Sequence, residues 1–215
     1  MHITGIERSP TRRARLDVYV DGVRTFDVTR AALSTHRLRP GRPIDAGEIE
    51  AIVAADARRA ALDAAVAMLA RRPCSEREVR QRLARRKVAP ALAEETVGRL
   101  RDARLLDDAA YAHVWTESRD RTSPRARRLL IQELRARGVA PEIANGATAD
   151  IAEADAAYRA AARRLRSLSG LEYAAFRDRL GALLQRRGFG WETCKTTVER
   201  CWRESGGAGG TDTWP

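Results

Sequence analysis

The sequence predicts a mainly α-helical protein: three tandem three-helix repeats in an elongated array, preceded by a small N-terminal β-hairpin or three-strand extension. Two observations indicate this fold class. After Asp45 the chain is dense in alanine, lacks β-branched runs and is punctuated by regularly spaced prolines, and it resembles itself at a period of about fifty residues. We expect the extension with a short helix at 1–45, repeats at 46–106, 107–152 and 153–204, and a disordered tail at 205–215.

The first residues follow the two-residue period of β-strands. Apolar and polar residues alternate over Leu16–Val20 and again over Val23–Val28, and Asp21-Gly22 lies between the two runs. Asp-Gly between alternating runs is a strong hairpin signal, because a type I′ turn needs positive φ at both central residues. Ile3–Glu7 could add a third strand, and Thr29–Leu38 predicts a short helix.

The internal repeat is found by shifting the sequence against itself. A shift of 51 residues aligns Pro73, Val79, Gln81 and Leu83 with Pro124, Leu130, Gln132 and Leu134. A further shift of 50 residues aligns Leu180 and Leu184 with Leu130 and Leu134. The expected helices are 56–71, 75–86 and 91–103 in the first repeat, 108–120, 124–137 and 141–152 in the second, and 153–168, 172–187 and 191–204 in the third.

Capping patterns support these boundaries. Asp45-Ala-Gly-Glu48 and Ser75-Glu-Arg-Glu78 fit the capping box, in which the first side chain accepts from a backbone amide and the glutamate reaches back. Gly138 and Gly188 follow the second and third middle helices, where a left-handed stop is expected. Lys87 holds that position in the first repeat, which predicts a weaker cap.

Composition excludes several classes of protein. The chain has 215 residues, of which 44% are hydrophobic, and a mean hydropathy of −0.46. It has no apolar run long enough for a membrane span, and Met1–Pro10 has no signal-like apolar core. Three cysteines are too few for a disulfide framework. We therefore expect a cytoplasmic monomer with no membrane partner.

The charge points to a polyanionic partner. The net charge is +11, and it is unevenly spread: +6 over residues 55–106, zero over 107–150 and +4 over 151–204. A basic surface of this kind attracts nucleic acid or acidic protein. Arginine supplies all but two of the basic residues, which also fits a GC-rich genome, so arginine content alone is no evidence of phosphate recognition.

Residues that would carry catalysis are not found together, so we expect no enzyme activity, no cofactor and no metal. The three histidines lie far apart, and the nucleotide- and metal-binding motifs are missing. Asp107-Asp108 suits helix capping better than acid–base chemistry. Cys194 and Cys201 lie on one helical face and suit packing. We expect the tryptophans Trp115, Trp191 and Trp202 to lie in the core or between repeats.

The middle helices offer the best candidate contact residues. Opposite the apolar pair of each middle helix, the first two repeats carry rows of arginine and glutamine with almost no acid. A merely solvated helix would usually intersperse glutamate, so an anionic partner is the sharper interpretation and a soluble face the plainer one. The candidates are Arg77, Arg80, Gln81, Arg85, Arg86, Lys87, Arg125, Arg128, Gln132, Arg135, Arg186, Arg187, Lys195 and Arg200.

Four motifs occur in a characteristic order. They are Ser75-Glu-Arg-Glu-Val-Arg-Gln-Arg-Leu83, Leu106-Asp-Asp-Ala-Ala-Tyr-Ala112, Gln132-Glu-Leu-Arg-Ala-Arg-Gly-Val139 and Arg186-Arg-Gly-Phe189. Over residues 55–204 the chain resembles the RecX family, regulators of the recombinase RecA. One departure is Ser123-Pro124, where family members often carry glycine; proline suits a helix start.

The resemblance implies a non-catalytic protein that binds the RecA–single-stranded DNA filament and usually inhibits it. Members limit filament growth or promote disassembly, restrain strand exchange, and in some cases bind single- or double-stranded DNA directly. The alternative is a sequence-independent or transcriptional DNA-binding protein built on helix-turn-helix units. A transcription regulator usually presents one recognition helix per protomer, whereas this chain repeats similar helices, which favours the filament regulator.

Overall fold

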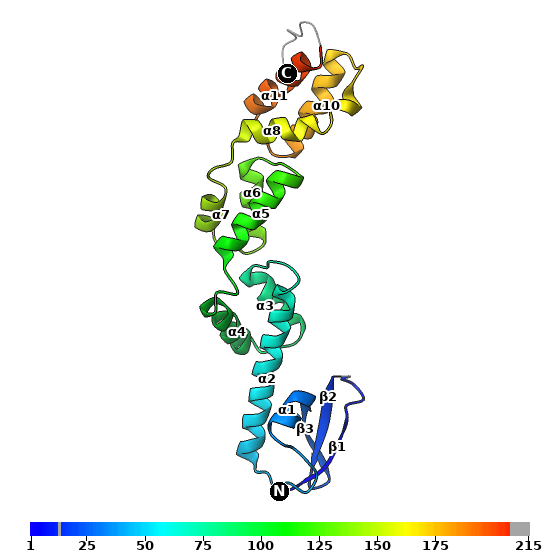
Figure 1. Cartoon of the computed structure of the whole chain (residues 1–215), viewed down its shortest axis with the longest axis vertical. Helices are drawn as coiled ribbons and strands as arrows, with labels where there is room; N and C mark the ends of the chain where they lie inside the picture. The colour runs from blue at the N-terminus through cyan, green and yellow to red at the C-terminus, as the bar shows by residue number, and fades with distance from the viewer. Residues whose placement is uncertain (13, 207–215) are drawn as a thin grey trace. The chain divides into compact units, whose positions relative to one another are not determined.

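The computed structural model describes residues 1–12 and 14–206, and Figure 1 shows the order of its elements. The chain divides into two compact units. One comprises Met1–Arg72 and Val79–Leu105, and the other comprises Pro73–Glu78 and the chain from Leu106 onward. The described chain is mainly helical and carries a small antiparallel sheet near its N-terminus, so the predicted fold class is confirmed.

The N-terminal sheet contains β1 (Ile3–Arg8), β2 (Arg15–Val20) and β3 (Val23–Thr29) in that spatial order. Asp21 and Gly22 join β2 to β3 with φ of 48° and 84°. Positive φ at both residues is what a type I′ turn requires. The predicted hairpin and its third strand are therefore confirmed.

Two helices cover this sheet. α1 (Arg30–Thr35) is capped by the Thr29 hydroxyl, and α2 (Ala46–Leu69) begins where Asp45 Oδ1 accepts from the Glu48 amide at 2.8 Å. The Glu48 carboxylate accepts from Arg42, so the reciprocal half of the capping box is replaced by an ion pair. The sheet and the first half of α2 share one core, with buried members Ile3, Val18, Val20, Phe26, Val28, Ala32, Leu38, Ile44 and Ile52.

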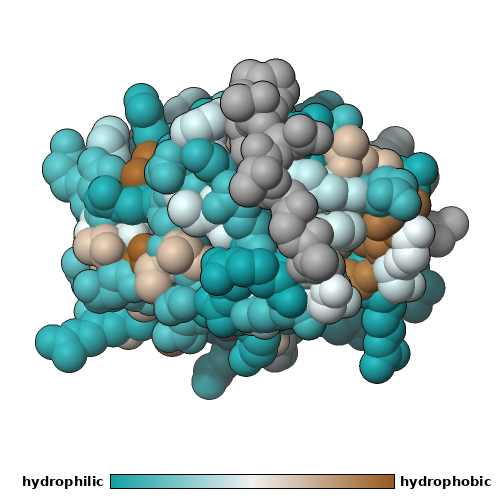
Figure 2. Space-filling model, turned by 90° about the horizontal axis from the view of Figure 1, so that it is seen from above, coloured by the Kyte–Doolittle hydropathy of each residue, from teal (hydrophilic) through white to brown (hydrophobic). Residues whose placement is uncertain are grey.

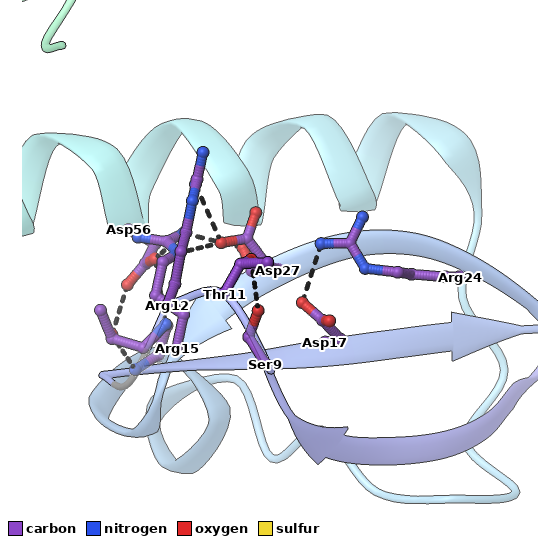
Figure 3. Close-up of polar contacts among 10 residues, drawn as sticks. Ser9, Thr11, Arg12, Arg15, Asp17, Arg24, Asp27 and Asp56 are labelled. Atoms are coloured by element: carbon purple, nitrogen blue, oxygen red, sulfur yellow. Dashed lines mark hydrogen bonds and ion pairs between the residues drawn. The ribbon is translucent and has the colours of Figure 1, made fainter.

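A buried polar cluster also ties the sheet to α2 (Figure 3). The side chain of Asp56 on α2 is 1% exposed and accepts from Arg15 Nη2 at 2.9 Å and from the Thr29 amide at 3.1 Å. Arg15 also pairs with Asp27 on β3. A carboxylate this deeply buried is tolerated only when its oxygens are paired and hydrogen-bonded. Ion pairs and hydrogen bonds therefore join the sheet to α2, in addition to their shared apolar core.

The rest of the first unit is built on the second half of α2. The helix expected at 56–71 is part of this 24-residue helix, because no breaker separates it from the Asp45 cap. α2 packs against α4 (Pro90–Asp102), through small side chains such as Ala61 and Ala65. α3 (Glu76–Arg85) starts in the second unit and continues into the first.

The second repeat contains α5 (Asp108–Thr122), α6 (Arg127–Ala136) and α7 (Pro141–Ala147). Its core comprises Tyr111, Ala112, Leu134, Val139 and Ala144. α6 begins three residues later than predicted, because the Ala126 amide donates to a carbonyl in the third repeat. α7 ends five residues earlier than predicted; the buried Thr148 that follows it donates its hydroxyl to the Ala144 carbonyl at 2.8 Å.

The third repeat contains α8 (Glu153–Ala162), α9 (Leu165–Leu168), α10 (Tyr173–Arg186) and α11 (Trp191–Glu204). The helix predicted at 153–168 is broken after Ala162, so that short α9 turns its leucines onto the repeat's core. On α8, four buried alanines allow close packing against α10 and α11. Most of the predicted tail, residues 207–215, lies outside the described residues.

Candidate partner-binding surface on the middle helices

Each middle helix buries one pair of apolar side chains four residues apart. The pairs are Val79 with Leu83 on α3, Leu130 with Leu134 on α6, and Leu180 with Leu184 on α10, all at most 1% exposed. They recur at intervals of 51 and 50 residues. The repeat found in the sequence is therefore a repeat of packing, and the basic rows can be placed relative to it.

The three middle helices also end in the same left-handed turn. Lys87, Gly138 and Gly188 have φ of 60°, 87° and 87°. After each, the next amide donates back to the carbonyl of the second core leucine, at 3.1 to 3.2 Å, which is the Schellman pattern. Lys87 forms this cap although the left-handed conformation costs a lysine about 1–2 kcal/mol. The weaker cap expected in the first repeat is nonetheless formed.

The first turn of α3 binds the end of α6, within the second unit. Ser75 and Glu78 form the predicted reciprocal capping box, with both bonds at 3.3 Å. The Ser75 hydroxyl also donates to the Arg137 carbonyl at 2.6 Å, and Arg77 Nη1 makes a long contact of 3.5 Å with the Ala136 carbonyl. Arg137 Nη1 reaches back to Glu78 Oε1 at 2.8 Å. Arg77 therefore contacts a neighbouring helix.

The start of α6 binds the end of α10 in the same way. The Ala126 amide donates to the Arg187 carbonyl at 3.0 Å, and Arg128 Nε donates to the Gly188 carbonyl. Arg187 Nη1 reaches back to the Pro124 carbonyl at 3.0 Å. Burial, together with the nearby charge of Arg125 and other arginines, lowers the pKa of Arg187.

These two contacts form a recurring helix junction. In each, arginine at the start of one middle helix meets carbonyls at the end of the next, where helices leave carbonyls unpaired and favour cations. Glycine at 138 and 188 permits the approach: a Cβ at 138 would lie 2.4 Å from Arg77 Cβ, and one at 188 would lie 3.1 Å from Leu129 Cβ. Three candidates, Arg77, Arg128 and Arg187, thus make contacts between helices of the second unit.

Two further candidates make ion pairs. Arg80 Nε donates to both carboxylate oxygens of Glu94, at 2.8 and 3.1 Å. Arg125 pairs with Glu133, a half-buried carboxylate that also accepts from Arg119 Nε at 3.0 Å and from Trp115 Nε1 at 3.1 Å. The neutral charge of the second repeat reflects such compensation.

The candidates on α11 are also engaged. Lys195 Nζ lies 5.3 Å from the centre of the Trp191 ring. Arg200 covers the Tyr158 ring at 3.8 Å and donates to Glu204 Oε1 at 2.9 Å. Hydrogen bonds from Tyr158 and Arg200 lower the pKa of Glu204. Trp191 is 49% exposed, so the expectation that it lies in the core or between repeats was wrong, whereas Trp115 and Trp202 pack against the repeat cores.

The remaining candidates are exposed and free. Within the described ranges 1–12 and 14–206, their side chains have no hydrogen-bond or ion-pair partner. They are Gln81, Arg85, Arg86, Lys87, Gln132, Arg135 and Arg186. Arg82 is equally exposed and free in the described ranges, and the helical pattern does not single it out because it lies beside the apolar stripe. These groups gather in the second half of each middle helix and the turn after it, most densely on α3.

Residues considered for catalysis have structural roles. Asp107 caps α5 by accepting from the amides of Ala109 and Ala110 at 2.8 and 3.0 Å. Cys194 and Cys201 are fully buried, and burial raises the pKa of the Cys201 thiol to about 11. Among the described residues no group of three or more His, Cys, Asp or Glu could hold a metal, and no helix is long and apolar enough to span a membrane.

Comparison with protein families assigns the chain. Residues 61–100, 107–147 and 152–198 match, in order, the first, second and third three-helix domains of RecX. The chain belongs to the RecX family. Curated relatives include a regulatory protein RecX of Lacticaseibacillus paracasei, 28% identical over 87% of this chain and 79% of that protein. Another is the Listeria innocua protein, 28% identical over 66% of this chain and 53% of that one.

Solved RecX structures share the fold. The chain superposes on a crystal structure of regulatory protein RecX with a TM-score of 0.63 and 23% identity, covering 92% of this chain and 98% of that one. The crystal structure of RecX from Lactobacillus salivarius superposes with a TM-score of 0.61 and 19% identity, covering 68% of this chain and 97% of that one. The curated relatives are named as regulatory proteins, so the family is one of regulatory proteins.

The RecX matches cover most of the candidate surface. All free candidates on α3, α6 and α10 lie inside the three matched RecX domains, whereas Arg200 lies beyond the third. Both helix junctions join one RecX domain to the next. This chain therefore uses some of its arginines for contacts between its own helices and leaves others exposed.

Proposed function

We propose that this protein binds the RecA filament on single-stranded DNA and limits its growth, acting as a cytoplasmic monomer without a cofactor. The observation that carries the proposal is the match to all three RecX domains in order over residues 61–198. The exposed arginines on three equivalent helices support it, because a chain that offers the same chemistry three times suits a partner that is itself a repeating polymer.

Electrostatic attraction supplies part of the binding. Residues 55–106 carry a net charge of +6, and the free guanidinium groups of Arg82, Arg85 and Arg86 lie close together at the end of α3 and in the turn after it. Such groups neutralise phosphates and release counterions, so binding to DNA is weak, independent of sequence and strongly salt-dependent. The same charges speed encounter with an acidic protein surface.

Inhibition needs little protein. A growing filament adds subunits at an end, so one molecule bound there prevents many later additions. The effect on RecA is therefore expected well below an equal molar amount of this protein, and it requires no nucleotide or metal.

The deciding experiment measures ATP hydrolysis by RecA on single-stranded DNA with substoichiometric amounts of this protein. The proposal predicts a fall in hydrolysis, together with a gel shift of random DNA that weakens steeply as salt rises. Unchanged hydrolysis, with tight binding to one particular duplex, would instead identify a transcriptional DNA-binding protein.

A further inference from the structure

The third repeat contains a hollow that its own described side chains do not fill. Its volume is about 280 Å³, and it opens between α9, the turn before α10, and the end of α11. It is lined mainly by Leu165, Leu168, Leu171, Phe176, Trp202 and Gly206. We call it the α9–α11 pocket. All of its lining belongs to the second unit.

The floor of the α9–α11 pocket is apolar and well packed. Phe176 is 2% exposed and Leu168 is 9% exposed, and both belong to the core of the repeat. The Trp202 ring is held against Tyr173 and Phe176, with ring centres 5.3 and 5.2 Å apart. Trp202 Nε1 is buried and has no hydrogen-bond partner among the described residues. A buried donor left unpaired is costly, so local packing alone does not account for this arrangement.

The size of the pocket indicates what kind of ligand it takes. Sites for small-molecule ligands usually enclose about 300–1,000 Å³. The α9–α11 pocket is at or below that range, and is large enough for one bulky apolar side chain. Protein interfaces commonly obtain most of their binding energy from such an anchor seated in a preformed apolar recess.

The residues next in sequence to the pocket lining carry mostly positive charge, which indicates the kind of segment that would surround the anchor. Arg164 and Arg166 flank Leu165, and Arg203 follows Trp202; all three are exposed and have no carboxylate partner in the described part of the chain. Glu172, which follows the lining residue Leu171, is an exposed acid, whereas Glu204 is already bound by Tyr158 and Arg200. In Figure 2, which views the chain from the α10–α11 end, small apolar areas lie among a mostly hydrophilic surface.

We propose that the α9–α11 pocket receives one aromatic or aliphatic side chain carried by an acidic segment of a partner protein. Its apolar floor takes the side chain, and the exposed arginines next in sequence to Leu165 and Trp202 pair with the carboxylates beside that side chain. The inference deepens the proposed function and rests on it for the partner, which would be a RecA subunit of the filament.

A pair of serine substitutions tests the pocket in the full chain. Ser169, the C-cap of α9, lines the pocket, and Ser167 within α9 does not. Both are exposed, and their hydroxyls donate to the carbonyl three residues earlier, at 3.0 Å from Ser169 and 2.8 Å from Ser167. Ser169→Trp places a large ring at the opening, and Ser167→Trp places the same ring outside it. We expect Ser169→Trp to weaken binding to RecA filaments on single-stranded DNA about tenfold or more, as loss of one anchor does. Ser167→Trp should bind like the wild type.

A peptide titration separates the pocket from the proposed function. The probe is acetyl-Asp-Glu-Phe-Glu-Asp-amide, with Ala and Lys-flanked versions as controls, and the readout is the indole N–H signal of Trp202, assigned by Trp202→Phe. We expect the acidic phenylalanine peptide alone to shift that signal, and Ser169→Trp to abolish the shift. If the peptide binds but wild type ignores the filament, the proposed function fails and the pocket stands.

Other results would overturn the inference. Equal filament binding by the two tryptophan variants would do so, and so would a Trp202 signal that does not respond to the peptide. A Trp202 signal that moves only with protein concentration would identify a second copy of the chain as the occupant. A Trp202 signal that moves on Trp214→Ala would identify the chain's own end as the occupant.

Discussion

Replacing Gly138 by alanine should weaken the junction between α3 and α6. Gly138 has φ of +87°, and a Cβ there would lie 2.4 Å from Arg77 Cβ and 2.5 Å from its Cδ. The left-handed conformation costs alanine about 1–2 kcal/mol, and relieving the overlap costs about 1–2 kcal/mol more. We therefore expect a loss of about 2–4 kcal/mol in the free energy of unfolding of the second unit, measured by urea denaturation followed by circular dichroism.

Gly98→Ala is the matched control. Gly98 lies inside α4, and nothing lies within 4 Å of a Cβ built there. Alanine should stabilise this helix by up to about 1 kcal/mol, so the two substitutions have opposite signs. Gly188→Ala, whose nearest contact is 3.1 Å, should fall between them. A Gly138→Ala protein as stable as the wild type would refute the close approach of Arg77 and with it the junction.

Three other predictions concern stability. Asp56→Ala should lower the free energy of unfolding, measured by thermal melting, by about 3 kcal/mol, because it removes one of the two carboxylate partners of the partly buried Arg15. Asp63→Ala, which removes an exposed ion pair, should lower it by less than about 0.5 kcal/mol. Hydrogen bonding lowers the pKa of Glu204 in the folded protein, so the stability that its carboxylate adds is complete above the usual pKa of 4.5 and is lost as the pH falls below it. Glu204→Gln should therefore make the melting temperature depend less on pH on the acid side. Deleting residues 1–44 should destabilise α2, seen as lost ellipticity, because Ile52 loses its core.

Much of the fold could be predicted because local rules determine it. The Asp21-Gly22 hairpin needs only two residues of suitable backbone freedom, and the caps at Asp45 and Ser75 need only the residues that follow. The repeats were visible because packing repeats the same apolar spacing. The end of α8 was missed, since the break that turns α9 onto the core depends on residues far along the chain.

The candidate surface was only partly predictable, for a related reason. Helical periodicity identifies which side chains point away from a helix's own core, but not what they meet. Arg77 and Arg128 point away from their core leucines and contact carbonyls of another repeat, about sixty residues away in sequence. Reversing their charge would therefore damage the junctions as well as any partner contact, and the free arginines are the better test.

The most direct test of the central claim is RecA ATP hydrolysis on single-stranded DNA with a charge-reversed protein. The variant Arg85→Glu/Arg86→Glu/Arg135→Glu changes only exposed groups without side-chain partners in the described chain, and such changes usually cost little stability. Arg30→Glu/Arg39→Glu/Arg58→Glu makes the same change in net charge on exposed positions outside the middle helices. We predict that the first variant loses most of its inhibition and the second retains it, with unchanged melting temperatures. Equal inhibition by both variants would contradict a contact through the middle helices.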